Sequence, residues 1–290
     1  MRKKDMGRNL KTLDYAQFST IEMNGKCVFH EYHHLKEMED IFHAYFPLYF
    51  YGGGSKLLLP EEQVVHFLCD KQQLFYETDQ FLYLSSGVPL AKVTQFLVSH
   101  DLEGAYLTGI PGTIGGAVRG NAGTNMGSIS RLVEEVLTYD GKNYHRYCSF
   151  QLHFANRQSI FKYRAEWICL VVLRKIADPT SKRKQNSVLQ GRIKQPKVPT
   201  LGSTFINTHD LPSGKILQIL DIKGLHYGGY EIAREHANFI VKKNPEIVAS
   251  NLRYFIELLM ELFYNYLGTM PRREIQEASK AQWKKKKKLH

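Results

Sequence analysis

The feature that most constrains this chain is the segment 109–117, which reads GIPGTIGGA and is closely followed by Asn121-Ala122-Gly123. Four of its nine residues are glycines, joined by a rigid proline and a threonine. Without a Cβ atom, a glycine adopts positive φ readily, so that its N–H group can turn toward an anion. A tight structural turn needs fewer glycines. The segment therefore predicts a loop on which a large planar or diphosphate ligand lies against the backbone.

An earlier glycine cluster, Gly52-Gly53-Gly54-Ser55, places three residues without side chains and a hydroxyl in one turn. In chain order this is the first glycine cluster, and residues 109–117 are the second. The first cluster begins like the Rossmann dinucleotide fingerprint, but Leu57 stands where the third glycine is needed. A convincing acidic partner about 20 residues further on is also missing. We therefore reject the Rossmann interpretation and treat the two clusters as separate phosphate-binding turns of one domain.

The apolar residues recur with both helical and strand periodicity. Helical patterns cover residues 35–45, a segment that begins at Pro89, residues 215–220, and a long segment that begins at Asn244-Pro245. Strand patterns cover residues 81–86, 133–139, 168–173 and 236–241. This mixture indicates an α+β protein.

Length and composition exclude several classes of protein. A chain of 290 residues with 43% hydrophobic residues can bury the cores of two or three ordered domains. Its longest apolar stretch, 254–266, is interrupted by Glu257 and Glu261, so we expect no membrane span. The basic N-terminus lacks the apolar core of a secretory signal. The four cysteines are far apart and form no C-x-x-C pair, which is typical of a reducing cytoplasm. We predict a cytoplasmic protein.

The net charge of +11 is concentrated in the N-terminal residues 2–11, in residues 182–197, and in the lysine run 284–288. Such runs could contact nucleic acid nonspecifically through its phosphates. No zinc finger, RNA-recognition signature or aromatic-interleaved basic face accompanies them, so we expect no specific nucleic-acid partner. A positive balance also suits an enzyme whose ligands carry diphosphates and carboxylates.

The sequence His30-Glu31-Tyr32-His33-His34 matches the H-E-x-x-H pattern of zinc enzymes. On a helix, this spacing places two imidazoles on one face. Here the motif follows Cys27-Val28-Phe29, which is more typical of a strand. We interpret it as a surface histidine cluster and predict no metal site.

Three polar residues in the second half lie in suggestive local sequences. Arg157 sits between apolar stretches, Ser203 follows a proline-rich segment, and Glu274 follows the long C-terminal helix pattern. No His/Asp pair lies near Ser203 to make it a nucleophile. Taken singly, each is typical of an ordinary surface.

Taken together, these segments resemble the UDP-N-acetylenolpyruvoylglucosamine reductase family from about residue 18 to residue 275. The family signature G-I-P-G-T-[VI]-G-G-A, followed by N-A-G, is matched at every position by residues 109–117 and 121–123. The family's G-x-G-S-N-L loop corresponds to residues 52–57. Its downstream motifs occur in the same order at Gln195-Pro196, Pro199, Gly202–Asn207, Ser213-Gly214-Lys215, Lys223-Gly224, Gly228-Gly229 and His236–Val241.

The resemblance implies an α+β fold in which a two-lobed FAD-binding domain of the PCMH/VAO type precedes a smaller α/β substrate-binding domain. The implied FAD-binding domain spans residues 1–180, with lobes at about 12–50 and 51–176. A basic linker follows at 181–198, then the substrate-binding domain at 199–278 and a lysine-rich tail at 279–290. The modest spacing between Arg157 and Ser203 suggests the shorter subclass of the family.

The resemblance also implies the chemistry. The reaction would be NADPH-dependent reduction, through bound FAD, of the enolpyruvyl group of UDP-N-acetylglucosamine enolpyruvate during peptidoglycan precursor synthesis. Arg157 would meet the substrate carboxylate, Ser203 would donate a proton to C2, and Glu274 would be their acidic partner. We expect a small-molecule nucleotide-sugar substrate and a monomer.

The same correspondence assigns the ligand-binding residues. Those for FAD are Gly52, Gly53, Gly54, Ser55, Lys56, Leu57, Gly109, Ile110, Pro111, Gly112, Thr113, Gly115, Gly116, Ala117, Asn121, Gly123, His236 and Ile240. Those for the substrate are Asn207, Lys215 and Gly228.

The chain departs from the family pattern around the ligand. Lys56 replaces the usual asparagine of the first loop, Asn156 stands where a tyrosine precedes the arginine, and Ile206 replaces a common lysine. These changes keep open a flavoprotein of the same fold with another substrate, such as an oxidase. A non-enzymatic module that binds nucleic acid or anionic membrane through its basic ends is the third hypothesis.

Overall fold

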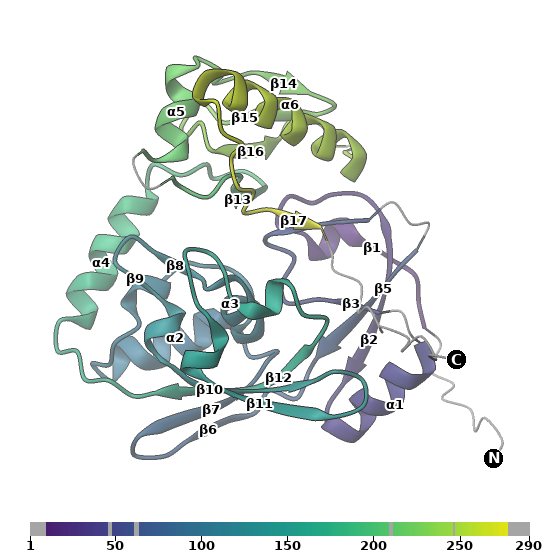
Figure 1. Ribbon diagram of the computed structural model, residues 1–290, viewed down its shortest axis with the longest axis vertical. Coiled ribbons are helices and arrows are strands. Elements are labelled where there is room, and N and C mark those ends of the chain that lie inside the picture. Colours follow the sequence, from purple (N-terminus) through teal and green to yellow (C-terminus); the bar gives the residue numbers. More distant parts are fainter. Residues whose placement is uncertain (1–9, 46–47, 61–63, 209–210, 246, 278–290) are drawn as a thin grey trace, which may run out of the picture.

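The computed structural model describes residues 10–45, 48–60, 64–208, 211–245 and 247–277. Within these ranges the chain forms three sheets of four or five strands, two short strand pairs and six α-helices (Figure 1). The basic residues 2–8 and the lysine run 284–288 lie outside the described residues.

The first lobe is a four-stranded sheet in the order β1-β2-β5-β3. Its strands are β1 Leu13–Asp14, β2 Lys26–Tyr32, β3 Tyr49–Phe50 and β5 Val65–Asp70. Strands β2 and β5 are parallel, and helix α1, Leu35–Tyr45, makes the crossover between them. The helix buries Met38, Ile41 and Phe42 at helical spacing. The predicted helix 35–45 is confirmed.

The second lobe is a five-stranded antiparallel sheet in the order β11-β10-β12-β7-β6. Its strands are β6 Phe75–Glu77, β7 Phe81–Ser85, β10 Val133–Tyr139, β11 Tyr144–Cys148 and β12 Trp167–Arg174. Helices α2, Leu90–Ser99, and α3, Ile114–Gly120, pack on it. Short strands β8, Gly123–Thr124, and β9, Gly127–Ser128, form a hairpin beside them. The predicted strands in this region and the helix after Pro89 are confirmed.

The C-terminal region is a four-stranded antiparallel sheet in the order β13-β16-β15-β14. Its strands are β13 Thr200–Ser203, β14 His226–Tyr227, β15 Tyr230–Ile232 and β16 Phe239–Lys242. Helices α5, Ser213–Ile219, and α6, Ala249–Leu267, cover it. Together the three regions give the α+β fold that the residue pattern indicates.

Two boundaries in this region were predicted wrongly. Helix α6 begins at Ala249, not at Asn244-Pro245, because its N-cap residue Val248 is still extended. Strand β16 begins at Phe239, since His236 closes a turn by accepting a hydrogen bond from the Phe239 amide at 3.0 Å.

The segment predicted as a basic linker, 181–198, contains helix α4, Ser181–Arg192. In Figure 1, α4 runs along one side of the molecule from the second lobe toward the C-terminal sheet. Only Ser181 and Val188 of this helix are buried, so its apolar pattern is too sparse to indicate a helix. The limits of the domains themselves stay a prediction.

The last described residues return to the first lobe. Strand β17, Gln276–Glu277, pairs in parallel with β4, Leu57–Leu58, directly after the first glycine cluster. In Figure 1, β17 lies between the C-terminal sheet and the first lobe. This return brings Glu274 close to residues more than two hundred positions earlier. No helix in the described ranges combines the length and hydropathy needed to cross a lipid bilayer.

Candidate active site

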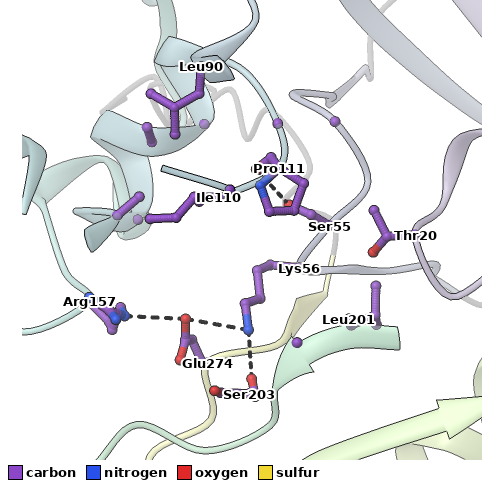
Figure 2. A pocket seen from close by; sticks show the side chains of 18 of the residues that line it. Thr20, Ser55, Lys56, Leu90, Ile110, Pro111, Arg157, Leu201, Ser203 and Glu274 are labelled. Atoms are coloured by element: carbon purple, nitrogen blue, oxygen red, sulfur yellow. Dashed lines mark hydrogen bonds and ion pairs between the residues drawn. The ribbon is translucent and has the colours of Figure 1, made fainter. Parts of the chain in front are cut away.

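A cavity of about 920 Å³ lies between the two glycine clusters, helix α4 and the C-terminal sheet. Arg157, Ser203 and Glu274, from three distant parts of the sequence, all line it (Figure 2). Most of the residues predicted to bind FAD line it as well: Gly52, Gly53, Gly54, Ser55, Lys56, Leu57, Gly109, Ile110, Pro111, Gly112, Thr113, Gly116, Ala117 and Gly123.

The glycines of the two clusters have different roles. A Cβ atom on Gly53 would lie 2.6 Å from the Cα atom of Gly112, so the two clusters touch backbone to backbone. Gly115 packs equally closely on Ser86 and does not line the cavity. By contrast, a Cβ atom on Gly116 would lie no closer than 3.6 Å to other protein atoms. Some glycines are therefore required by packing, whereas Gly116 leaves room for a ligand.

The second glycine cluster is not a loop throughout, as the sequence predicted. Its second half is helix α3, whose first amides are capped by the Thr113 hydroxyl, which accepts a hydrogen bond from Gly116 at 3.3 Å. The helix ends at Asn121, which has left-handed backbone geometry. The Asn121 side-chain Nδ2 donates a hydrogen bond to the Ala155 carbonyl at 2.8 Å. Asn121 is buried and supports the cavity wall without lining it.

The three residues predicted to be catalytic meet at one side of the cavity. The Nε atom of Arg157 lies 3.3 Å from Oε1 of Glu274. The same carboxylate oxygen lies 3.4 Å from the Nζ atom of Lys56. The Lys56 ammonium also donates a hydrogen bond to the Ser203 carbonyl at 2.7 Å. Figure 2 shows these side chains converging from opposite walls.

Local backbone contacts hold each of them in place. Arg157 has positive φ (55°), and its guanidinium donates to the Gly123 carbonyl at 2.7 Å. Ser203 ends strand β13 directly after Gly202, which also has positive φ (71°). The Glu274 amide donates to the Thr204 carbonyl at 2.8 Å, so Glu274 runs beside the end of β13. Among the described residues, the Ser203 hydroxyl has no hydrogen-bond partner and can face a ligand.

The remaining predicted residues lie elsewhere. His236, predicted to bind FAD, lines a smaller pocket of about 430 Å³ together with Asn207 and Lys215, the predicted substrate residues. Ser203 lines both cavities and therefore joins them. Ile240 is 1% exposed and belongs to the core.

Gly228 lines neither cavity. It turns the β14–β15 hairpin with positive φ, and a Cβ atom there would lie 2.6 Å from Asn251. This tight turn explains why position 228 is a glycine.

Three cations of the cavity wall were missed by sequence reasoning: Arg119, Lys162 and Arg192. Burial lowers the pKa of each, and for Lys162 the nearby Glu274 acts in the opposite direction. The guanidinium carbon of Arg119 lies 5.3 Å from the centre of the Phe50 ring. The buried Nε atom of Arg192 has no hydrogen-bond partner among the described residues. The only available signal was their position inside the glycine-rich, Arg157-containing and basic segments.

The histidine motif is a surface cluster only in part, since His33 and His34 are exposed whereas His30 is buried. His30 is 2% exposed in strand β2, and its Nε2 atom lies 2.9 Å from Nδ1 of His66 on the neighbouring strand. Alternation along a strand turns His30 inward. Within the described ranges, no group of three or more His, Cys, Asp or Glu residues could hold a metal ion.

Comparison with known proteins agrees with this geometry. Residues 194–276 match the family model described as UDP-N-acetylenolpyruvoylglucosamine reductase, C-terminal domain. A protein of that name from Prochlorococcus marinus (strain NATL2A) is 30% identical over 237 residues, which cover 78% of this chain and 81% of the relative. One from Moorella thermoacetica is 31% identical over 232 residues, covering 77% of this chain and 76% of the relative.

The fold is also similar to a solved structure. The crystal structure of UDP-N-acetylenolpyruvylglucosamine reductase from Thermus caldophilus matches with a TM-score of 0.80 and 26% identity. The match covers 93% of this chain and 99% of the Thermus chain. The similarity therefore extends over both lobes and the C-terminal sheet.

Proposed function

This chain belongs to the UDP-N-acetylenolpyruvoylglucosamine reductase family, and we propose that it reduces the enolpyruvyl group of UDP-N-acetylglucosamine enolpyruvate to UDP-N-acetylmuramate. As a member of this family it is an oxidoreductase of peptidoglycan synthesis. The observation that carries the proposal is the meeting of Arg157, Ser203 and Glu274 at a cavity walled by two glycine clusters.

The cavity fits FAD. Gly116 lines the cavity with bare backbone, and the Arg192 guanidinium in the same wall, which donates to Gln195 at 3.3 Å, forms no ion pair among the described residues. A diphosphate is a suitable partner for both, because backbone amides and a guanidinium bind its oxygens. The residues that would hold FAD are therefore the cavity-facing glycines, Thr113 and Arg192. When bound, the flavin supplies hydride transfer from NADPH to C3 of the substrate's vinyl group.

The protein's own residues would stabilise the charge that develops on the substrate and supply the proton that the substrate gains. Negative charge develops at C2 and in the substrate carboxylate as C3 gains hydride. Arg157 would stabilise that charge, a contribution of about 3 kcal/mol by analogy with other oxyanion donors. Ser203 would deliver a proton to C2, and Glu274 would hold the enolic form. The smaller pocket beside Ser203, with Asn207 and Lys215, would take the nucleotide-sugar part of the substrate.

Anaerobic spectroscopy of the purified protein tests the proposal. The protein should show a flavin spectrum that NADPH bleaches and the enolpyruvyl substrate restores, with a product heavier by two hydrogens. In Ser203→Ala, bleaching by NADPH should persist, whereas restoration by the substrate should slow by about 10²- to 10⁴-fold. A reduced flavin that the substrate does not reoxidise would reject the proposed reaction.

The same measurements separate the alternatives. The departure at Lys56 is the reason to consider a flavoprotein of this fold with another substrate. Its reduced flavin would be reoxidised rapidly by O₂, and its activity would not depend on Ser203. A nucleic-acid or membrane-binding module would depend on residues 284–288, whose deletion should leave NADPH oxidation by the proposed reductase unchanged. A monomer in the cytoplasm remains our expectation, and size-exclusion chromatography tests the first part.

A further inference from the structure

Lys56 connects the first glycine cluster to the two residues expected to handle the substrate's proton. It directly precedes strand β4, on the wall opposite the C-terminal sheet. Its ammonium nevertheless reaches the main chain of Ser203 at 2.7 Å and the carboxylate of Glu274 at 3.4 Å (Figure 2). One side chain therefore contacts both partners from the other side of the cavity.

The backbone around Lys56 is tied to the same place. The Gln276 amide donates to the Lys56 carbonyl at 2.9 Å, where β17 pairs with β4. Opposite, a Cβ atom on Gly202 would lie 2.9 Å from the Lys56 ammonium. The lysine thus fills the space next to Gly202, the residue with positive φ, and contacts the carbonyl of the next residue, Ser203. The orientation of Ser203 depends on the turn at Gly202.

The charges at this site are also coupled. A single oxygen of Glu274 is shared between Lys56 at 3.4 Å and Arg157 at 3.3 Å. The Lys56 side chain is 35% exposed and lines the cavity. Burial lowers the pKa of its ammonium, and Glu274 acts against that shift. An uncharged residue at position 56 would leave Arg157 as the only cation, among the described residues, paired with this oxygen of Glu274.

We propose that Lys56 is a positioning residue for proton delivery. It holds the Ser203 main chain and the Glu274 carboxylate in the positions that the bound substrate requires. The inference rests on the proposed function, since it gives Lys56 its role in the reduction of the enolpyruvyl group. Lys56 touches Ser203 and Glu274, so its removal affects the step in which the substrate gains its proton. Reduction of the flavin by NADPH uses neither contact.

The experiment measures the two half-reactions separately in the FAD-loaded protein by anaerobic stopped flow. Lys56→Met keeps the aliphatic stem and removes the charge and the donor. Reoxidation of the reduced flavin by substrate should slow by about 10- to 100-fold in its limiting rate, as expected for a displaced catalytic group. The half-saturating substrate concentration should change by less than about threefold, because a contact that acts in the transition state is lost. Flavin reduction by NADPH should stay within about twofold of wild type.

Three further variants make the result specific. Lys56→Arg retains a cationic donor and should restore reoxidation to within about fivefold of wild type, whereas Lys56→Gln, a neutral donor, should restore less. Lys71→Met is the matched control, since Lys71 forms an exposed ion pair with Glu31 at 3.2 Å, away from the cavity. The control should leave both half-reactions unchanged. If Lys56→Met does not fold, the comparison of Lys56→Arg with Lys56→Gln decides.

Two outcomes overturn the inference. One is wild-type reoxidation in Lys56→Met. The other is an equal loss in both half-reactions together with weaker FAD binding, which would make Lys56 a structural cross-link. Failure of the proposed function is distinct, because the wild-type protein itself would then not be reoxidised by the substrate.

Discussion

At the scale of single residues, glycines that resemble each other in sequence differ in what surrounds them. A Cβ atom on Gly53 would collide with Gly112, whereas one on Gly116, which lines the cavity from helix α3, would make only ordinary contacts with the protein. We expect Gly53→Ala to lower the free energy of unfolding of the FAD-free protein by about 1–3 kcal/mol, as overpacking does. Gly116→Ala should leave it unchanged or higher by about 0.5–1 kcal/mol, since alanine favours a helix.

Binding of FAD completes this test. Gly116→Ala should weaken FAD affinity by about tenfold or more, because the new methyl group occupies ligand space. Urea unfolding of the FAD-free proteins and fluorescence titration with FAD measure the two quantities independently. An FAD affinity in Gly116→Ala equal to that of wild type would show that the ligand does not approach helix α3.

The buried histidine pair predicts a pH-dependent stability. Burial lowers the pKa of His30 to about 4, and the neighbouring His66 adds to this shift. In the unfolded chain the pKa of a histidine is about 6.5, so between pH 6.5 and 4 the unfolded state binds the proton and the folded state does not. The stability contributed by His30 is therefore complete above pH 6.5 and is lost as the pH falls.

From pH 7 to pH 5 this residue should account for a loss of about 2 kcal/mol in the free energy of unfolding. The measurement is urea unfolding of wild type and His30→Gln at both values, in which each protein serves as its own reference. The wild-type protein should lose more stability than the variant. Equal losses in the two proteins would contradict a neutral, buried His30.

The residues that could be predicted from sequence are those whose role is carried by short, local motifs. The glycine clusters, Arg157, Ser203 and Glu274 could be singled out, and the structure brings them to one cavity. Lys56 could be noted as a departure, but not its contact with Ser203, because that contact joins positions 147 residues apart. The structure gives Gly228 a role in a tight hairpin, and a glycine required by such a turn is indistinguishable in sequence from one that faces a ligand.

At the scale of elements, helix α4 has a role that its composition hides. Its last residue, Arg192, lies over Gly109, where a Cβ atom would come within 3.0 Å of the arginine Nε atom. We expect Arg192→Gln to weaken FAD binding by about 10- to 100-fold, since a hydrogen bond to a charged group contributes about 1.5–3 kcal/mol.

A matched control lies on the same helix. Arg183 is exposed, so Arg183→Gln should bind FAD as wild type does. Titration of the FAD-free proteins with FAD and with ADP, both followed calorimetrically, measures the affinities without any turnover. If Arg192→Gln bound both ligands with wild-type affinity, the Arg192 guanidinium would not contact the diphosphate.

Strong periodicity made elements predictable, and weak periodicity did not. Helix 35–45 and strand 133–139 were predicted with the bounds that the structure has, because apolar side chains recur regularly in both. Helix α4 buries only two of its residues, and three of the seven residues of helix α3 are glycines. Glycine disfavours a helix, so helix α3 depends on tertiary contacts, whereas helix α4 consists largely of good helix formers such as Lys, Arg and Gln but lacks an apolar periodicity.

At the scale of the whole molecule, the hydrophobic cores do not follow the order of the chain. The largest core joins residues of the first lobe, such as Tyr15 and Phe67, to residues of the C-terminal region, such as Phe205 and Phe255. Hydrogen bonds cross the same boundary, since the Asn24 amide donates to the Ile247 carbonyl at 3.1 Å. The buried core of the second lobe, by contrast, draws only on residues between Leu82 and Leu173.

Which segments share a hydrophobic core could not be predicted from the sequence, because the order of the motifs shows only where each segment begins. The arrangement of the cores predicts that fragments of the chain differ in their ability to fold alone. A fragment of residues 74–178 retains every buried member of the second core and should unfold cooperatively in urea. A fragment of residues 199–277 loses the aromatic partners from the first lobe and should expose Phe205 and Phe255 to solvent.

The second fragment should therefore bind a hydrophobic dye and show poorly dispersed amide signals in NMR spectra, as chains without fixed packing do. Joining it to residues 10–72 through a flexible linker should restore a cooperative transition, since those residues supply the missing part of the core. A cooperative transition in residues 199–277 alone would mean that the C-terminal sheet needs no partner. The position of Ser203 and Glu274 relative to the first glycine cluster would then depend on polar contacts, such as those of Lys56, and not on a shared hydrophobic core.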